Sequence, residues 1–341
     1  MAKQGRIFAV IFLALLIPVL LKAPESEAKV YRGKCKSNLT WSYDSKTKTM
    51  VIDCKGDMPD DEQFYDLDMG WRKYYFKTKK VILKKGISSI GAGAFYNFQK
   101  LEEVVLPEGL RIIKYDAFDG CRKLQFINKP STLEVIEKDV FWDVKIKSIS
   151  LKNLKKLGSE CFSGAKLQSV DIPAKCKIED SVFWSCKKLK KVTFEKGVKR
   201  ISYGMFRETG IKNIDIPGSV TQIGTYAFAN CQSLKKAIIN EGVKKISKDA
   251  FSNTALKEIT IPSTVTKLGK NAFRWESTEK SSLKKVVIRS KNIKKWGTMV
   301  FGATRDDLVI YVPKSKKAEY EKILRSTNGL DFHAKIVGKK W

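Results

Sequence analysis

Apolar and polar positions alternate between Ile211 and Cys231 in a pattern that recurs along most of the chain. Pro217 and Gly224 mark bends within this stretch. Its apolar positions are Ile211, Ile214, Ile216, Val220, Ile223 and Phe228. A unit this short cannot bury six apolar side chains by itself, so near-copies must stack above and below it. The pattern therefore predicts a repeat array.

A column of phenylalanines sets the period of this array. Successive members are 23, 23, 21, 21, 23, 22, 23, 22 and 28 residues apart. The column consists of Phe95, Phe118, Phe141, Phe162, Phe183, Phe206, Phe228, Phe251, Phe273 and Phe301. Such a regular period over ten units selects a solenoid. We place about ten turns between residues 81 and 313.

Short strands are predicted ahead of each phenylalanine. Apolar residues alternate there in pairs, as in Val170 with Ile172 and Ile214 with Ile216. A period of two over so few residues predicts a strand with one buried face. Several of these strands are followed by a proline, which ends the strand without removing a donor from its middle. Neighbouring strands then stack as a parallel ladder, about 4.8 Å apart.

Residues 1–28 are predicted to be a signal peptide. Lys3 and Arg6 precede an apolar run from Ile7 to Leu21, and small residues follow at the expected cleavage positions. An uncleaved anchor is the alternative, which we disfavour because the run is shorter than the about 20 residues of a membrane span. The expected location is outside the cell, with no stable membrane insertion after cleavage.

Residues 29–80 are predicted to form an N-terminal cap that contains a β-hairpin. Leu39, Trp41 and Tyr43 alternate with polar residues, and a second short run begins at Thr49. If the turn lies at Asp44-Ser45, then Cys35 faces Cys54 across the ladder. That register predicts a disulfide; two unlinked thiols are the alternative. A nearby aromatic cluster is predicted to plug the open end of the core, and it contains Trp71, Tyr74, Tyr75 and Phe76.

Residues 314–341 are predicted to form a C-terminal cap. Ser315 is a candidate N-cap for a short helix whose apolar positions suit packing against the last turn. These positions are Ala318, Tyr320, Ile323 and Leu324. Gly329 ends that pattern, and Phe332, Ile336 and Val337 predict a final strand.

The repeating unit resembles a known family. The consensus L-x-x-V-x-I-P-x-x-V-x-x-I-G-x-x-A-F-x-x-C, nearly intact from Ile211 to Cys231, is similar to the BspA-like leucine-rich repeats of bacterial surface and secreted proteins. This resemblance implies an α/β repeat solenoid: a right-handed leucine-rich-repeat coil with short parallel strands, an N-terminal β-hairpin cap and a C-terminal helical cap. It also implies extracellular interaction, in several cases adhesion, without fixing a ligand.

Three irregularities interrupt the repeats. Lys129 occupies a strand position that is usually apolar, and the turns ending at Phe162 and Phe183 are short. The segment 274–282 is extra sequence before the last turn, and inserted residues must emerge as a loop. Trp275 within this insert is a candidate exposed aromatic contact, with simple packing as the alternative.

The composition argues against catalysis. His333 is the single histidine, and no metal-binding, phosphate-binding or nucleophile motif is present. Five cysteines occupy core positions of the repeat, where Cys is a small apolar filler. They are Cys121, Cys161, Cys176, Cys186 and Cys231. We therefore expect no enzyme activity, no cofactor, no metal and no small-molecule substrate.

Lysines are the candidate binding residues. The chain has 66 Lys and Arg against 36 Asp and Glu, a formal net charge of +30. Superposed repeats turn a fixed position of the unit into a line, and two basic lines are predicted. One line precedes the strands: Lys190, Lys191, Lys212, Lys235, Lys236, Lys257, Lys284 and Lys285. The other follows them: Arg111, Lys199, Arg200, Lys244, Lys245, Lys267, Lys294 and Lys295.

Two functions are consistent with these patterns. The first is a secreted or cell-surface binding or adhesion protein that engages a protein or glycan of a host or of the cell envelope through the solenoid face, retained by charge. The second is a binder of a polyanion such as nucleic acid, teichoic acid or a sulfated glycan, because stacked like charges repel by about 1 kcal/mol per pair and a bound polyanion relieves this. A solvated lysine-rich surface is the alternative to both.

Overall fold

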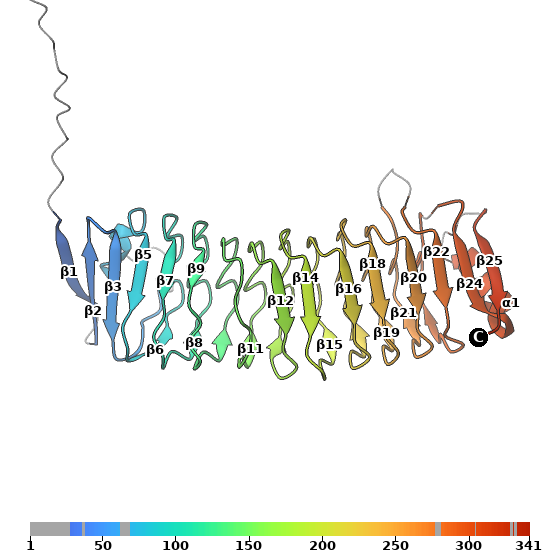
Figure 1. The fold of residues 1–341 in the computed structure, drawn as a ribbon, viewed down its shortest axis with the longest axis horizontal. Coiled ribbons are helices and arrows are strands. Elements are labelled where there is room, and N and C mark those ends of the chain that lie inside the picture. The colour runs from blue at the N-terminus through green and yellow to red at the C-terminus, as the bar shows by residue number, and fades with distance from the viewer. Residues whose placement is uncertain are drawn as a thin grey trace, which may run out of the picture.

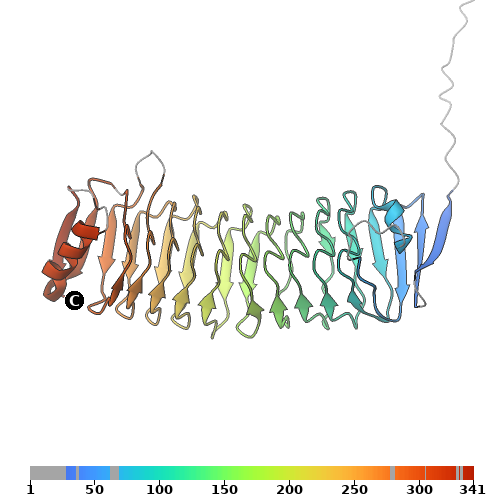
Figure 2. The ribbon, with the colours of Figure 1, turned by 180° about the vertical axis from the view of Figure 1, so that it is seen from behind.

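The computed structural model describes residues 28–35, 38–61, 69–276, 281–303, 305–327, 330 and 333–341. These residues form a rod, a β-solenoid of about 11 turns with mostly parallel strands (Figures 1 and 2). The predicted solenoid is confirmed, with slightly more turns than expected. The predicted signal peptide, Gly329 and Phe332 lie outside the described residues, apart from Ala28.

Each turn of the coil has three sides, and the first carries the longer strands, which lie side by side along the rod (Figure 1). Outward and inward positions alternate along them, as in β16, because the inward side chains face the core. The parallel strands of this side are β5 (Lys80–Leu83), β7 (Glu103–Val105), β9 (Phe126–Ile127), β12 (Ser169–Ile172), β14 (Lys191–Phe194), β16 (Asn213–Ile216), β18 (Lys236–Ile239), β20 (Glu258–Ile261), β22 (Lys285–Ile288), β24 (Val309–Pro313) and β25 (Lys335–Lys339).

The second side carries shorter strands. Hydrogen bonds join them into two ladders, one from β4 to β13 and the other from β15 to β23. The strands are β4 (Gly56–Asp57), β6 (Ile87–Ile90), β8 (Ile112–Ile113), β10 (Val135–Ile136), β11 (Lys156–Leu157), β13 (Lys177–Ile178), β15 (Arg200–Ile201), β17 (Gln222–Ile223), β19 (Lys245–Ile246), β21 (Lys267–Leu268) and β23 (Lys295–Trp296).

The third side has no strands among the described residues, and it carries the phenylalanine column. Each column residue up to Phe273 donates its backbone N–H to the carbonyl just before the next phenylalanine, as Phe95 does to Ala117 at 2.9 Å. Tight turns flank each phenylalanine, and the residue two positions before it has positive φ, as in Asp116 (φ 55°). Short polar residues and glycine tolerate this conformation best. We call this hydrogen-bonded row of turns the spine.

The phenylalanine rings stack face to face along the interior. Successive ring centroids are 5.1 to 6.0 Å apart, and the planes differ by 2° to 18°. All ten rings are buried. Burial of one such ring contributes about 1.5 to 3 kcal/mol, so the column is the main apolar element shared by all turns.

The predicted hairpin exists, but its register was wrong. β2 (Leu39–Asp44) pairs with β3 (Thr49–Cys54) so that Asp44 faces Thr49, with a four-residue loop between them. The Asp44 carboxylate accepts hydrogen bonds from the Lys46 and Thr47 amides, which stabilises this longer loop.

The predicted Cys35–Cys54 disulfide is not formed in this structure. An additional strand, β1 (Val30–Cys35), pairs with β2, and Leu39 of β2 lies between the two cysteines. Two strand spacings put their Cα atoms about 10 Å apart, beyond the about 7 Å that a disulfide spans. The sulfur of Cys35 lies 3.8 Å from that of Met69 instead.

The aromatic cluster lies at the N-terminal end of the core. Trp71 is buried, and its indole donates to the Ala94 carbonyl at 3.1 Å. Tyr74, at the end of the short helix η2 (Arg72–Tyr74), is also buried, whereas Phe76 is 51% exposed. Trp71 and Tyr74 therefore cover the first turns as a plug would, and Phe76 does not.

The C-terminal residues pack on the last turn. Helix α1 (Lys317–Thr327) buries Tyr320 and Leu324, and the Tyr320 hydroxyl donates to the Ser290 carbonyl at 3.1 Å. Ser315 lies within the preceding helix η3 (Lys314–Lys316) rather than capping α1. The roles of both ends as caps, and the boundaries at residues 80 and 313, remain predictions. Among the described residues, we find no helix with the length and apolarity to cross a membrane.

The phenylalanine column yields a stability prediction. Phe228→Ala removes a ring stacked on both sides and leaves a cavity, so we expect the free energy of unfolding to fall by about 3 to 5 kcal/mol. Urea unfolding followed by circular dichroism measures this. Phe126→Ala, at a ring 62% exposed, is the control and should change stability by less than about 0.5 kcal/mol. Equal effects of the two substitutions would contradict a core held by the column.

Candidate functional site

Five lysines stand at the same position in five successive turns. Each immediately precedes a strand of the first side, from β14 to β22, and all five side chains are exposed. They are Lys190, Lys212, Lys235, Lys257 and Lys284. None has an ion pair within the described part of the chain. These five residues, which we call the lysine line, repeat once per turn, and those on hydrogen-bonded neighbouring turns are about 4.8 Å apart. Only Lys284 among them shows an electrostatic interaction with a described carboxylate, that of Asp307.

In three turns the residue after the lysine-line residue is also a lysine that the sequence analysis predicted as a binding residue. The strand pairing shows which residue lies opposite each of these three lysines. Lys191 opens β14 opposite Ser169, and Lys236 of β18 lies opposite Asn213. Lys285 of β22 lies opposite Glu258, with which it forms an ion pair at 3.3 Å. All three lysines are exposed, so they widen the lysine line on the outer face of the first side.

The second predicted line begins the strands of the second side. Lys156 pairs in register with Lys177. In the other ladder Arg200, Gln222, Lys245, Lys267 and Lys295 form one row. Lys244 directly precedes this row and is exposed, whereas Lys245 is half-buried. The structure therefore places both predicted lines on the surface, one at the start of each strand type.

Acidic residues neutralise only the N-terminal half of the second line. Glu134 pairs with Lys155 at 2.9 Å and with Arg111 at 3.0 Å, and these two hydrogen bonds hold the pKa of Glu134 below its ordinary value. Glu179 pairs with Lys156 and Lys177, both at 3.4 Å. From residue 199 onward no ion pair occurs in this line among the described residues. Uncompensated positive charge is thus concentrated in the C-terminal half.

An apolar stripe, which the sequence analysis missed, runs beside these lysines. Ile238 is 40% exposed and Val337 is 38% exposed, both on the outer face of the first side. Between them, Val287 pairs in register with Thr260 and Tyr311, and Tyr311 with Val337. Ile238, Thr260, Val287, Tyr311 and Val337 form this stripe. Two runs in the sequence break the alternation of apolar and polar residues and could have revealed this stripe: Ala237-Ile238-Ile239 and Val286-Val287-Ile288.

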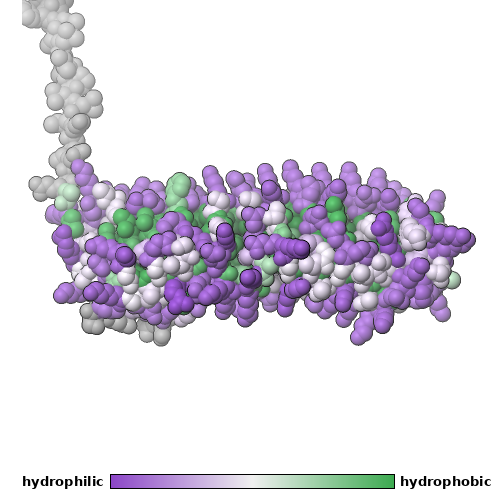
Figure 3. All heavy atoms as spheres, turned by 60° about the horizontal axis from the view of Figure 1, so that its bottom comes forward, coloured by the Kyte–Doolittle hydropathy of each residue, from purple (hydrophilic) through white to green (hydrophobic). Residues whose placement is uncertain are grey.

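A groove opens in the stripe where β18 and β20 are not hydrogen-bonded to each other. Its volume is about 400 Å³, and apolar and charged side chains both line it. They include Ile238, Val287, the cations Lys236, Lys285 and Arg289, and the carboxylates Glu241 and Glu258. Figure 3 shows the same mixture on a wider scale, with hydrophilic side chains in rows along the rod and apolar patches between them. This groove can hold an apolar side chain beside an acidic group.

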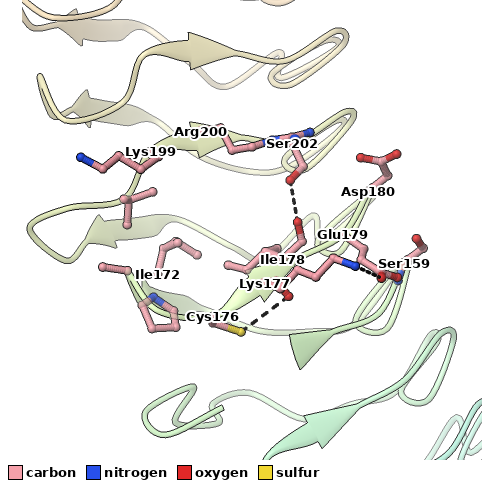
Figure 4. A pocket seen from close by; sticks show the side chains of 13 residues that line it. Ser159, Ile172, Cys176, Lys177, Ile178, Glu179, Asp180, Lys199, Arg200 and Ser202 are labelled. Carbon is pink, nitrogen blue, oxygen red and sulfur yellow. Dashed lines mark hydrogen bonds and ion pairs between the residues drawn. The ribbon is translucent and has the colours of Figure 1, made fainter. Parts of the chain in front are cut away.

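Another gap lies on the second side, between β13 and β15 (Figure 4). The pocket there has a volume of about 390 Å³. The hydroxyl of Ser202 donates to the Ile178 carbonyl at 2.8 Å, and Lys177 points toward Glu179. Cys176 lines the same pocket, but burial raises the pKa of its thiol to about 11, so it is a poor nucleophile at neutral pH.

The cysteines of the column are structural. Cys121, Cys186 and Cys231 each donate to the carbonyl of the phenylalanine one turn earlier, at 3.2, 3.0 and 3.0 Å. Burial raises the pKa of Cys186 to about 12 and that of Cys231 to about 11. Thiols of this kind fill the core and satisfy a backbone acceptor.

Trp275 is only partly exposed. Its backbone N–H donates to the Gly302 carbonyl at 3.2 Å, and its indole nitrogen is buried. Residues 277–280 of the insert lie outside the described residues. Trp275 is not brought together with the lysine line by any contact that the structure records, and its role in binding remains a prediction.

The described residues form an elongated repeat protein whose outer face carries rows of lysines beside exposed apolar side chains. Across residues 73–280, more than half of the chain, the sequence matches the family described as BspA type leucine rich repeat region, in six copies. The chain belongs to this family. No curated protein matches it significantly.

Solved structures of other bacterial leucine-rich repeat proteins share this fold. A leucine-rich repeat protein from Bacteroides ovatus is 21% identical with a TM-score of 0.58, and the match covers 89% of each chain. A leucine-rich repeat protein from Eubacterium ventriosum is 20% identical with a TM-score of 0.58 and is matched over 86% of its length, with 84% of this chain covered. At these identities the likeness shows the fold alone.

The cysteine environments yield a reactivity prediction. At pH 7.5 the thiols of Cys186 and Cys231 should react with a thiol reagent such as DTNB at least about 100-fold more slowly in the folded protein than in urea, because they are buried and protonated. Half-buried Cys176 should react first among the repeat cysteines. Rapid native labelling of Cys231, located by mass spectrometry, would contradict a purely structural role.

Proposed function

We propose that this protein is a secreted or cell-surface binding protein without catalytic activity, which engages a protein of a host or of the cell envelope through the outer face of the first side. The observation that supports this is the apolar stripe bordered by the lysine line. Exposed apolar residues at the centre and charges at the rim are the arrangement of protein interfaces.

The expected partner is acidic and has apolar side chains that fit the groove between β18 and β20. Lys236 and Arg289 at the groove complement carboxylates, whereas Lys285 is already paired with Glu258. Ile238 and Val287 offer apolar contact. Electrostatic attraction then speeds association, and the apolar contacts carry most of the affinity. Family membership and the basic N-terminal segment followed by an apolar run support an extracellular or surface location.

Polyanion binding is the second candidate, and a different observation favours it. The five residues of the lysine line repeat at a fixed spacing without ion pairs in the described structure, which suits a polymer with regularly spaced negative charges. Teichoic acid, a sulfated glycan and nucleic acid share this property. For such a ligand, log Kd depends linearly on log salt concentration, with a slope that reflects the number of contacts.

Two variants distinguish the candidates. Neutralising the lysine line (Lys190, Lys212, Lys235, Lys257 and Lys284, each to Gln) should lower the salt slope of polyanion binding by up to about 5. Ile238→Ser with Val287→Ser should instead weaken protein binding about tenfold or more with little change in salt dependence. The measurement is retention on isolated cell envelopes and on host-cell surfaces from 50 to 500 mM salt, on the order of the range over which ionic contacts are lost.

The matched control changes five exposed lysines outside the lines: Lys34, Lys123, Lys152, Lys270 and Lys322, each to Gln. It removes the same net charge. If this control reduced retention as much as the lysine-line variant does, then net charge alone would explain binding and the site would be wrong. If neither the lysine-line variant nor the stripe variant altered retention, the first side would not be the binding face.

A further inference from the structure

A second surface, at the N-terminal end of the rod, combines exposed aromatic rings with lysines. Here a pocket of about 550 Å³ lies between β1, β2 and the segment that follows η2. Its aromatic residues are Tyr31, Tyr43, Tyr74 and Phe76, and its lysines are Lys48, Lys77, Lys79 and Lys100. Ser45 completes the lining. The pocket is far along the rod from the lysine line (Figure 1).

The tyrosines form a rigid floor. Tyr43 stacks on Tyr74 with ring centroids 4.2 Å apart, and Tyr31 lies 5.5 Å from Tyr74. Tyr31 and Tyr43 are also cross-strand neighbours on β1 and β2. Burial raises the pKa of Tyr43, and the neighbouring Tyr74 phenol adds to this effect, so the Tyr43 hydroxyl stays protonated and can donate a hydrogen bond.

Two rings stay open to a ligand. Tyr31 is 42% exposed and Phe76 is 51% exposed, although Phe76 also contacts Tyr75 with ring centroids 3.8 Å apart. An exposed aromatic face beside a pocket is a stacking platform for a flat, partly apolar ring. The exposed rings of Tyr31 and Phe76 are not needed to cover the first turn of the core, because Trp71 and Tyr74 already cover it.

Most of the lysines in the lining carry positive charge without an ion pair among the described residues. Lys48, Lys77 and Lys100 have no ion pair with any residue that the structure describes, while Lys79 pairs with Glu102 at 3.3 Å. Asp44, which follows Tyr43 in β2, accepts hydrogen bonds from the Lys46 and Thr47 amides. Among the described residues, no carboxylate lines the pocket. Four ammonium groups around stacked phenols therefore favour an anionic ligand.

We propose that this pocket binds an acidic sugar unit of an anionic glycan. The apolar face of a sugar ring stacks on Phe76 or Tyr31, its hydroxyl groups bond with the phenols and Ser45, and its carboxylate or sulfate contacts Lys77 and Lys100. The volume suits one or two sugar rings. Single-stranded nucleic acid fits less well, because it requires a basic groove that follows a backbone, whereas these lysines surround one pocket.

The test is binding of the protein to defined oligosaccharides by calorimetry. The probes are a uronic acid hexasaccharide, a sulfated hexasaccharide of the heparin type, a neutral hexasaccharide and a single-stranded oligothymidylate. We expect at least one acidic hexasaccharide to bind at least about tenfold more tightly than the neutral one, and the preference between the two acidic probes identifies carboxylate or sulfate as the recognised group.

Substitutions locate the binding. Phe76→Ala and Tyr31→Ala should each weaken binding of the preferred acidic hexasaccharide about tenfold, and Lys77→Gln with Lys100→Gln should do the same and reduce its salt dependence. Phe126→Ala and Lys123→Gln, an exposed ring and an exposed lysine elsewhere, are the matched controls and should bind normally. Unchanged circular dichroism and melting temperature show that each variant folds.

Three results would overturn the proposal: equal binding of the neutral hexasaccharide, oligothymidylate binding at least as tight and sensitive to the same substitutions, or acidic-glycan binding that Phe76→Ala and Tyr31→Ala leave unchanged. The stripe and lysine-line variants leave this pocket intact. If those variants lose retention on cells but still bind the acidic hexasaccharide, the two sites act independently. The proposed function and the glycan pocket can therefore each be rejected without the other.

Discussion

Every turn of this protein depends on the turn before it and the turn after it. A single turn has one phenylalanine and a few aliphatic residues that it cannot bury alone, and only stacking removes them from water. The continuous contacts are therefore those between successive phenylalanine rings and the backbone hydrogen bonds of the spine beside them. The strand ladders also hold neighbouring turns together, but among the hydrogen-bonded rows only the spine joins every pair of turns from Phe95 to Phe301.

The array was predictable from the sequence because its signal is repeated ten times. The phenylalanine spacing, the alternation in strands such as β16 and the core positions of Cys121, Cys186 and Cys231 all depend on local patterns that neighbouring copies confirm. The predicted parallel strands and the BspA type family are confirmed for the same reason. Lysines at a fixed position, such as Lys212 and Lys235, likewise had to form lines once the turns were superposed.

Features that occur once were harder to predict. The hairpin register depends on the Asp44 carboxylate, which favours a four-residue loop over the two-residue turn assumed from spacing. β1 has exposed residues on both faces over much of its length, so alternation gave no signal for it. The N-terminal pocket unites Tyr31, Tyr74 and Lys100, which are distant in sequence, and the exposed side of Ile238 follows from its register opposite Asp215.

The interruptions of the ladders have a mechanical consequence. Between β13 and β15 the second side lacks strand pairing, while β12 and β14 remain paired and the Phe183 amide still bonds to the Met205 carbonyl. The first side is open between β9 and β12, between β14 and β16 and between β18 and β20, and at the last of these β19 and β21 stay paired. The rod therefore bends most easily where one side lacks strand pairing. The gap on that side widens, and the continuous spine acts as the hinge. Under shear or tension the rod should flex at these interruptions, in a direction that depends on which side is open, and the core should stay intact.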